Sequence, residues 1–259
     1  MFRDLGKLIS KVSPDFQRLL ITHMNQMKKK IGIVGGLSPE STASYYLYIT
    51  RKYADTFDNY DYPEIIIYSV NLENYHHWRS IDRWDLIVDD LISCFKKLKI
   101  AGADFGLIAT NTMHKVYDQV SSAVDLPIIN IIDETAHEAK KLGISTLGLL
   151  GTKYTMSDGF YQDRLSKFNI DALVPDLKQQ EIVHKVIVEE LVRGIVSGKS
   201  KKQYIEIIEE LIFKGAQGII LGCTEIPLLI KQNDMTVQFL DTTIIHSEAA
   251  LKAAIELNV

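Results

Sequence analysis

The chain has 259 residues, of which 46% are hydrophobic and 24% are charged, and this balance excludes disorder as the main state. Its 29 basic and 33 acidic side chains give a net charge of −4, so we expect no nucleic-acid partner, because phosphate contacts need a basic surface. Two cysteines exclude a disulfide scaffold and fit a reducing cytosol, so the expected location is cytoplasmic. No apolar run approaches the roughly 20 residues that cross a bilayer, so we expect no membrane partner.

Residues 1–27 differ in character from the rest of the chain. Residues 1–26 have the pattern of a weak amphipathic helix, interrupted at Ser13, Pro14 and Asp15. Met27 is followed by three lysines and then by a buried strand, as at the natural start of a domain. We interpret residues 1–27 as an N-terminal extension; a helix packed on the domain surface is the alternative.

From Ile31 onward, short apolar runs alternate with longer amphipathic segments. Runs that are apolar on both faces are typical of parallel strands covered on both sides, and their alternation with helices predicts an α/β fold with parallel sheets. The expected strands cover 31–34, 64–70, 105–109, 127–132, 146–150, 170–174, 218–221 and 237–240. The expected helices cover 40–57, 82–100, 113–122, 133–142, 154–168, 178–197, 200–215, 224–231 and 242–257.

Two pairs of motifs recur at nearly one spacing, which indicates duplicated halves. A glycine ends a strand at Gly35 and again at Gly151, 116 residues later, and Thr110 and Cys223 follow two further strands 113 residues apart. We therefore expect two similar parallel-sheet domains with pseudo-twofold symmetry. Because ligands bind outside the carboxyl ends of such strands, we expect the active site in the cleft between the domains. The expected boundaries are 28–127 plus 235–259 for the first domain and 128–234 for the second.

Cys223 lies where an expected strand meets an expected helix. Amides at a helix N-terminus lower the pKa of a thiol and raise its thiolate fraction, so Cys223 is a candidate for chemistry. The alternative is a small buried apolar residue, which is common for cysteine. Cys94 lies within an expected helix and is interpreted as a core or helix-face residue.

Thr110 occupies the position in the first half that Cys223 occupies in the second. Its hydroxyl could cap the following helix, or point toward a ligand from the side opposite Cys223. Asn111 and Thr112 add polar groups that suit a carboxylate. His114 is a candidate to assist them, and a surface histidine on a helix is the alternative.

A glycine-bearing loop at 35–42 leads into a helix, and such loops bind anions through backbone N–H groups. Its sequence is neither G-x-G-x-x-G nor a Walker loop, so the signal for a dinucleotide is weak. In the second half, 151–155 is the partner loop, and its Lys153 is suited to pair with a carboxylate. The adjacent His76 and His77 have no further ligand at metal-site spacing, so we expect no metal.

These motifs together resemble the aspartate/glutamate racemase superfamily, and within it the aspartate racemase branch. The family's Cys-Asn-Thr-x-His run stands here as Thr-Asn-Thr-Met-His at 110–114, and its Gly-Cys-Thr-Glu run stands at 222–225. The form at 110–114 is similar to that of a subgroup of broad-specificity amino-acid racemases. The resemblance covers about residues 28–257.

The resemblance implies a homodimeric isomerase that racemises aspartate, glutamate or both, independent of pyridoxal phosphate and of any other cofactor. One group removes the α-proton of the amino acid, and a second group on the opposite face returns a proton. The catalytic pair that it implies is Thr110 and Cys223. The substrate contacts that it implies are Ser38, Asn111, Thr112, Thr152, Lys153, Thr155, Thr224 and Glu225.

Thr110 departs from the family pattern, which has a cysteine at this position. A hydroxyl is a far weaker acid than a thiol, so Thr110 should be a poor base that could still pass a proton to a carbanion. Two alternatives to the racemase stay open. One is a single-cysteine decarboxylase or isomerase of the same superfamily, and the other is a member that binds an amino acid without turning it over.

Overall fold

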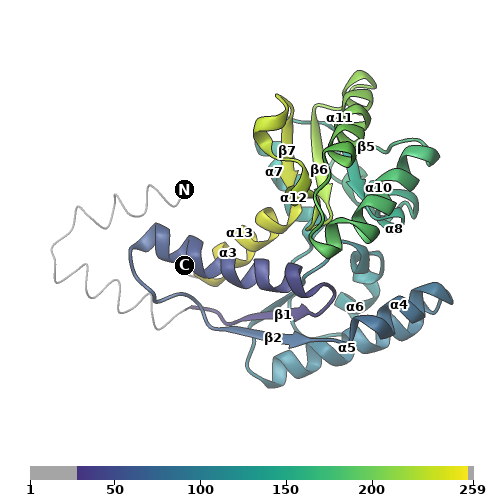
Figure 1. The fold of residues 1–259 in the computed structure, drawn as a ribbon. Coiled ribbons are helices and arrows are strands. Elements are labelled where there is room, and N and C mark those ends of the chain that lie inside the picture. The colour runs from purple at the N-terminus through teal and green to yellow at the C-terminus, as the bar shows by residue number, and fades with distance from the viewer. Residues whose placement is uncertain (1–27, 256–259) are drawn as a thin grey trace. The chain divides into compact units, whose positions relative to one another are not determined.

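The computed structural model describes residues 28–255, whereas residues 1–27 and 256–259 are drawn in grey in Figure 1. The N-terminal extension expected at 1–27 therefore lies outside the described residues. Within 28–255, no helix combines the length and the apolar character that crossing a membrane requires. The chain divides into two compact units, each with its own sheet.

Among the described residues, the first unit comprises 28–107, Val120–Ile128 and 247–255, and its sheet has the strand order β2-β1-β3. The continuous apolar run of β1 (Ile31–Gly35) is buried along its whole length, and β1 pairs in parallel with β2 (Ile65–Ser69). The remaining strand and the helices of this unit are β3 (Phe105–Ile108), α3 (Pro39–Phe57), α4 (Leu72–Ser80) and α5 (Trp84–Ile100).

The loop after β1 is a tight turn that only glycine fits. Gly36 has a φ of 78°, and a Cβ there would lie 2.4 Å from the backbone oxygen of Val70. The chain then enters α3 with Ser38 as its N-cap, since the Ser38 hydroxyl accepts the N–H of Ser41. The glycine-bearing loop thus serves the start of α3.

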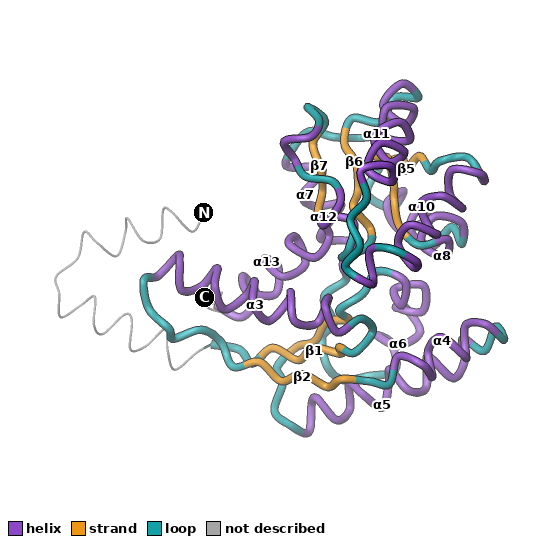
Figure 2. Tube along the Cα trace, in the orientation of Figure 1, coloured by secondary structure: helices purple, strands orange, loops and turns teal. Residues whose placement is uncertain are grey.

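The second unit comprises Ile108–Gln119 and Ile129–His246, and it is built on a parallel sheet of order β5-β4-β6-β7. Figure 2 draws its strands in orange. The strands are β4 (Thr146–Gly151), β5 (Asp171–Leu173), β6 (Gly218–Gly222) and β7 (Gln238–Asp241). The helices that follow β3 along the chain are η1 (Thr112–Val116), α6 (Tyr117–Ser122), α7 (Ile131–Lys141), α8 (Lys153–Ser157), α9 (Phe160–Ser166), α10 (Leu177–Glu189), η2 (Leu191–Arg193), α11 (Gly198–Phe213), α12 (Ile226–Leu229), η3 (Gln232–Asp234) and α13 (Thr242–Ile255).

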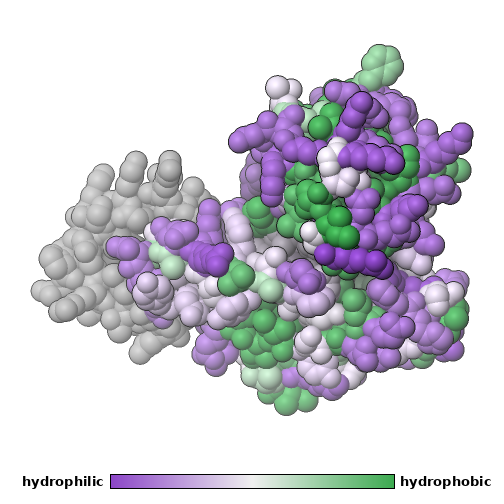
Figure 3. All heavy atoms as spheres, in the orientation of Figure 1, coloured by the Kyte–Doolittle hydropathy of each residue, from purple (hydrophilic) through white to green (hydrophobic). Residues whose placement is uncertain are grey.

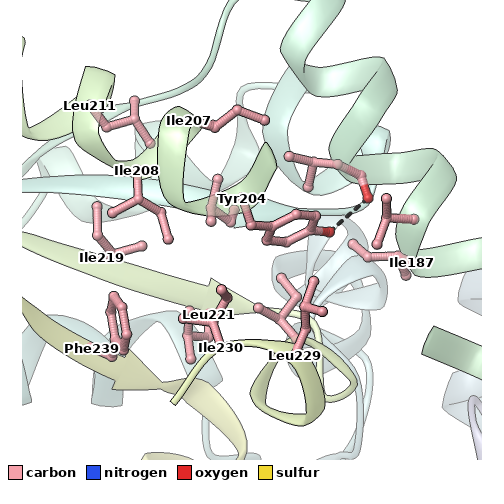
Figure 4. Close-up of a cluster of buried hydrophobic side chains, with 14 of the residues drawn as sticks. Ile187, Tyr204, Ile207, Ile208, Leu211, Ile219, Leu221, Leu229, Ile230 and Phe239 are labelled. Atoms are coloured by element: carbon pink, nitrogen blue, oxygen red, sulfur yellow. Dashed lines mark hydrogen bonds between the residues drawn. The ribbon is translucent and has the colours of Figure 1, made fainter. Parts of the chain in front are cut away.

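Strand β6 is buried on both faces, which explains why its sequence is apolar without alternation. Ile219 and Leu221 belong to a cluster with α10 and α11, and Figure 4 shows it around the Tyr204 ring. Ile220 points the other way, into a second cluster with α7 and α9. Figure 3 shows many hydrophilic side chains on the visible face of the part that carries α10 and α11. Because β6 packs into both clusters, the residues that follow it begin from a fixed position.

The segment 127–132 is not a strand, and that prediction was wrong. Only an isolated bridge joins Ile128 to Gly106, since Pro127 has no N–H to donate to a ladder. Asn130 instead caps α7, because its side-chain oxygen accepts the N–H of Ile132 at 2.8 Å.

Several helices also differ from their predictions. The expected helix 113–122 is η1 followed by α6, and the expected helix 224–231 covers only Ile226–Leu229. The expected helix 154–168 is two helices, α8 and α9, which meet at Gly159 with a φ of 77°. The expected helix 178–197 ends at Glu189. The helix α4 was not predicted, because its residues have little apolar periodicity.

The units differ from the expected domain boundaries in two segments and at Ile128, which belongs to the first unit. Residues 108–119 and 235–246 belong to the second unit, whereas the expected boundaries place them in the first domain. Strand β7 pairs with β6, with Gln238 opposite Gly218, so the chain after residue 235 extends the second sheet. The pairing of β7 with β6 explains why residues 235–246 belong to the second unit, and the spacing of motifs in the sequence does not reveal it.

Replacing Ile219 by alanine is expected to lower the free energy of unfolding by about 3 kcal/mol, because a fully buried side chain leaves a cavity. Phe213→Ala is the control, since Phe213 is 91% exposed and its loss should cost less than about 0.5 kcal/mol. Urea unfolding followed by circular dichroism measures both. Equal losses in the two variants would contradict the placement of Ile219 in the core.

Candidate active site

The carboxyl ends of β4, β6 and β7 lie at one edge of the second sheet, because these strands are parallel. Thr152 follows β4, Cys223 follows β6 and Thr242 follows β7. The segment Ile108–Gln119 belongs to the same unit and carries Thr110. Most of the residues singled out from the sequence are therefore in this unit.

Cys223 is partly buried, and its thiol donates a hydrogen bond to Glu225 Oε2 at 2.9 Å. The hydroxyl of Thr224 donates to the same oxygen at 2.8 Å. Glu225 is 4% exposed, so this carboxylate is buried with its two donors. Three consecutive side chains thus form one hydrogen-bonded group.

The expectation that a helix N-terminus lowers the pKa of Cys223 was wrong. Its pKa lies well above the ordinary 9.0, first because burial disfavours the thiolate and then because the Glu225 carboxylate repels it. The backbone amides of Thr224 and Glu225 act in the expected direction but are outweighed. Helix α12 begins only at Ile226 and has four residues, so its dipole is small.

Thr110 is partly buried, and its backbone shapes the local turn. Its N–H donates to the oxygen of Ile108 at 2.8 Å, and its carbonyl accepts a hydrogen bond from His114 Nδ1 at 2.8 Å. The N-cap residue of η1 is Asn111, not Thr110. The Thr110 hydroxyl therefore does not cap η1, so one of its two expected roles was wrong.

His114 and His246 are buried neutral histidines. His114 Nε2 accepts the N–H of Ile131 at 3.3 Å, so the proton is on Nδ1, which donates to Thr110. Burial lowers the pKa of His114 to about 4 and that of His246, whose Nε2 lies 3.0 Å from the oxygen of Ile129, to about 3. His114 is 4% exposed and joins the Thr110 turn to α7, so it is not a surface histidine.

Three threonine hydroxyls form a row at this edge. Thr112 Oγ1 lies 3.3 Å from Thr152 Oγ1, which lies 3.2 Å from Thr155 Oγ1. Thr152 is the N-cap residue of α8, so the start of that helix fixes the middle hydroxyl. Because each hydroxyl can donate or accept, the row can adapt to an anionic group.

The amide of Asn111 is held on both sides by protein groups. Its Nδ2 donates to Thr242 Oγ1 at 3.0 Å, and its Oδ1 accepts the hydroxyl of Tyr161 at 3.2 Å. Asn111 is 3% exposed. The structure thus places Asn111 in a buried network, where the sequence suggested a group that faces a ligand.

Two further predicted contacts are Lys153 and Ser38. Lys153 is exposed, and its ammonium lies 5.1 Å from the centroid of the Tyr154 ring. Ser38 belongs to the first unit, where its hydroxyl caps α3.

Sequence reasoning missed Tyr161, Thr242 and His246 as members of this region. A usable signal existed for Thr242, because it follows a strand at the same edge as Cys223. Tyr161 lies on α9, and His246 lies on α13. Neither belongs to a strand-end loop, so only the packing of those helices reveals them.

This edge offers a thiol that shares its proton with a carboxylate, and hydroxyl donors that suit a carboxylate ligand. Such groups can move a proton to or from carbon without an added redox group. Within residues 28–255, no three His, Cys, Asp or Glu side chains are grouped as a metal site requires.

Comparison with known proteins agrees with the motifs. Residues 34–250 match the family described as Asp/Glu/Hydantoin racemase. A broad specificity amino-acid racemase of Bacillus subtilis (strain 168) is 26% identical over 227 residues, which cover 82% of this chain and 92% of that protein.

Solved structures confirm the α/β fold. A candidate Asp/Glu racemase from Yersinia pestis is 41% identical, with a TM-score of 0.84 over 88% of this chain and 100% of that one. An aspartate racemase homologue from Pyrococcus horikoshii OT3 is 38% identical, with a TM-score of 0.79 over 88% of this chain and 100% of that one.

Stability is expected to fall as the pH drops from 6.5 toward 4. The two buried histidines have pKa values of about 4 and about 3 in the folded state and 6.5 when unfolded, so acid favours the unfolded chain. Each should remove about 1.4 kcal/mol per pH unit in this window. Urea unfolding between pH 7 and 5 measures the slope.

His246→Gln should reduce that slope by about half, because it removes one of the two titrating groups. His137→Gln is the matched control, since the His137 side chain is 51% exposed, and it should leave the slope unchanged. An unchanged slope in His246→Gln would contradict the assignment.

Glu225→Gln is expected to lower the pKa of the Cys223 thiol, because it removes the negative charge that opposes the thiolate. Alkylation by iodoacetamide, measured for the Cys223 peptide as a function of pH, reports this pKa. Glu189→Gln, at an exposed residue of α10, is the control. A pKa that stays the same or rises in Glu225→Gln would refute this role of the carboxylate.

Proposed function

We propose, from the premise that the chain belongs to the Asp/Glu/hydantoin racemase family, that it racemises an acidic amino acid, aspartate or glutamate, without a cofactor. Membership of this family makes the chain an amino-acid racemase, an isomerase. In the proposal, Cys223 and Thr110 act on opposite faces of the substrate α-carbon. The observation that carries it is the hydrogen bond from the Cys223 thiol to Glu225.

The thiol–carboxylate pair explains how a thiol with a raised pKa can act as a base. Moving the proton from Cys223 Sγ to Glu225 Oε2 forms a thiolate beside a neutral acid, so the site gains no net charge. The two atoms are 2.9 Å apart, which is a direct path for that proton. In our proposal, Glu225 is the proton acceptor of Cys223 and acts through it.

The proton count of the proposed reaction closes over one turnover. The thiolate of Cys223 removes the α-proton of one enantiomer, and Thr110 delivers its hydroxyl proton to the opposite face. Cys223 is then a thiol and Thr110 an alkoxide. Glu225, which still holds the proton it took from Cys223, releases that proton to water, and the Thr110 alkoxide takes a proton from water. The thiol, the carboxylate and the hydroxyl of the starting state are thereby restored. The alkoxide makes Thr110 the slower partner, because a hydroxyl is a far weaker acid than a thiol.

The carbanion formed at Cα places negative charge on the substrate carboxylate, which calls for fixed donors. The row of hydroxyls of Thr112, Thr152 and Thr155 supports this part of the proposal, since a hydroxyl can rotate to donate a hydrogen bond to a carboxylate. Lys153 is exposed and carries a positive charge that suits a second carboxylate. The proposed substrate contacts are Thr112, Thr152, Lys153, Thr155 and Thr224.

Aspartate and glutamate are proposed together. The two substrates differ by one methylene, which is worth only about 1–3 kcal/mol of discrimination. The Bacillus subtilis relative is a broad specificity racemase, and the Pyrococcus horikoshii relative is an aspartate racemase homologue. Both descriptions support an amino-acid substrate, and the first supports a tolerant site.

Proton NMR in D₂O with L-aspartate and then L-glutamate should show loss of the α-proton signal, and chiral chromatography should show the D-enantiomer. Cys223→Ala should abolish both, because it removes the base. Thr110→Ala should keep exchange from the L-enantiomer and lose at least about 100-fold in inversion, since a positioned proton donor supplies about that factor.

Cys94→Ala is the control, since Cys94 is a buried thiol of the first unit, and it should retain both exchange and inversion. Loss of exchange in Thr110→Ala as large as in Cys223→Ala would refute the division of roles. Carbon dioxide release from a malonate-type substrate, without exchange on either amino acid, would favour the decarboxylase alternative. Binding without exchange would favour a non-catalytic member.

A further inference from the structure

We infer that Tyr161 and Thr242 are positioning residues that hold the Thr110 turn and the Cys223 loop at a set separation. The inference rests on the proposed function, because only a two-face reaction needs that separation. Neither side chain belongs to the motifs at 110–114 and 222–225, and neither is among the proposed substrate contacts. They act through a buried chain of hydrogen bonds that passes through Asn111.

The chain of hydrogen bonds runs in one direction from α9 to β6. The Tyr161 hydroxyl donates to Asn111 Oδ1 at 3.2 Å, and Asn111 Nδ2 donates to Thr242 Oγ1 at 3.0 Å. The Thr242 hydroxyl then donates to the backbone oxygen of Leu221 at 3.0 Å. Each group donates to the next, so the bonds polarise one another in the same sense.

The two ends of this chain lie next to the two proposed catalytic residues. Asn111 follows Thr110 directly, and Leu221 is two residues before Cys223. The only residue between them is Gly222, where a Cβ would lie 2.8 Å from the oxygen of Leu150. A shift of Asn111 relative to Leu221 therefore moves Thr110 relative to Cys223.

The Tyr161 end of this series of hydrogen bonds is held by ion pairs. Arg164, one turn along α9 from Tyr161, forms a two-pronged ion pair with Asp133 of α7, with distances of 2.6 and 2.7 Å. A second ion pair joins Lys115 of η1 to Asp158, just before α9, at 2.7 Å. Tyr161 itself is fully buried in the cluster of α7 and α9.

Packing alone does not explain a hydroxyl at these positions. Phenylalanine would fill the site of Tyr161 and valine that of Thr242, without the cost of burying a polar group. Both residues are 0% exposed, so that cost is offset only by partners inside the protein. What the hydroxyls add is a defined position, and misplacement by about 1 Å can cost about 100-fold in rate.

The first test follows L-aspartate and L-glutamate in D₂O and measures two products, the L- and the D-enantiomer deuterated at Cα. The first product counts carbanions that regained a proton on the same face, and the second counts those that regained it on the opposite face. Their ratio depends on the placement of Thr110 and not on the amount of folded protein. A purely structural role would lower both products alike.

Tyr161→Phe and Thr242→Val are expected to raise the ratio of retained to inverted product about tenfold, the factor that one buried hydrogen bond can supply. Thr242→Ser keeps the hydroxyl and should keep the ratio of the unchanged protein. Tyr75→Phe is the matched control, since Tyr75 is also 0% exposed and its hydroxyl donates to Asp90 at 2.8 Å in the first unit. It should leave the ratio unchanged.

The second test needs no activity, so it separates this inference from the proposed function. Iodoacetamide alkylation is measured peptide by peptide by mass spectrometry, so that Cys223 and Cys94 are counted separately. Loosening the Leu221 end should speed alkylation of Cys223 about tenfold in Tyr161→Phe and Thr242→Val, but not in Thr242→Ser or Tyr75→Phe.

Each outcome decides one question. An unchanged ratio together with an unchanged Cys223 alkylation rate in both variants would overturn the inference, as would an equal effect in Tyr75→Phe. If the unchanged protein neither exchanges nor inverts either amino acid, the proposed function fails. The alkylation rates then decide alone whether Tyr161 and Thr242 position the Cys223 loop.

Discussion

Polar groups buried at the carboxyl edge of the second sheet must find partners within the protein, and the site depends on this constraint. An unpaired buried donor or acceptor costs about 1–3 kcal/mol, so the hydrogen bonds of a buried polar side chain fix its position. Asn111, His114 and Glu225 are all less than 5% exposed, and each is hydrogen bonded to a strand-end loop or to a helix. These hydrogen bonds hold the loops that follow the strands.

The electrostatics of Cys223 show why position in the fold does not by itself predict reactivity. The nearby backbone amides favour the thiolate, as a helix start would, but burial and the Glu225 carboxylate act more strongly in the opposite direction. A thiol in such a place is poorly reactive unless the carboxylate can take its proton. The same interaction that raises the pKa of the thiol thus provides the acceptor that the proposed chemistry needs.

The two buried histidines have a structural role for a related reason. Burial keeps both neutral, and a neutral ring lets His114 donate to the carbonyl of Thr110 and accept the N–H of Ile131. His114 donates a hydrogen bond to the carbonyl of Thr110, and the next residue, Asn111, is held by Tyr161 and Thr242. The proposed proton donor therefore sits on a turn with little freedom, in a protein whose sheet is packed on both faces by apolar clusters.

The sequence by itself determined the α/β class, most strands and the two motifs at 110–114 and 222–225, because apolar runs and strand-end polar residues are local signals. The tertiary structure decided what spacing cannot show. Residues 235–246 belong to the second unit because β7 pairs with β6. The strand expected at 127–132 is reduced to a single bridge between Ile128 and Gly106. The tertiary structure also brought Tyr161 to Asn111 across 50 residues, and Thr242 to Asn111 across 131. Hydrogen bonds between distant residues depend on how helices and strands pack. The burial that raises the pKa of Cys223, against the expected direction, depends on the same packing. No local sequence pattern encodes either effect.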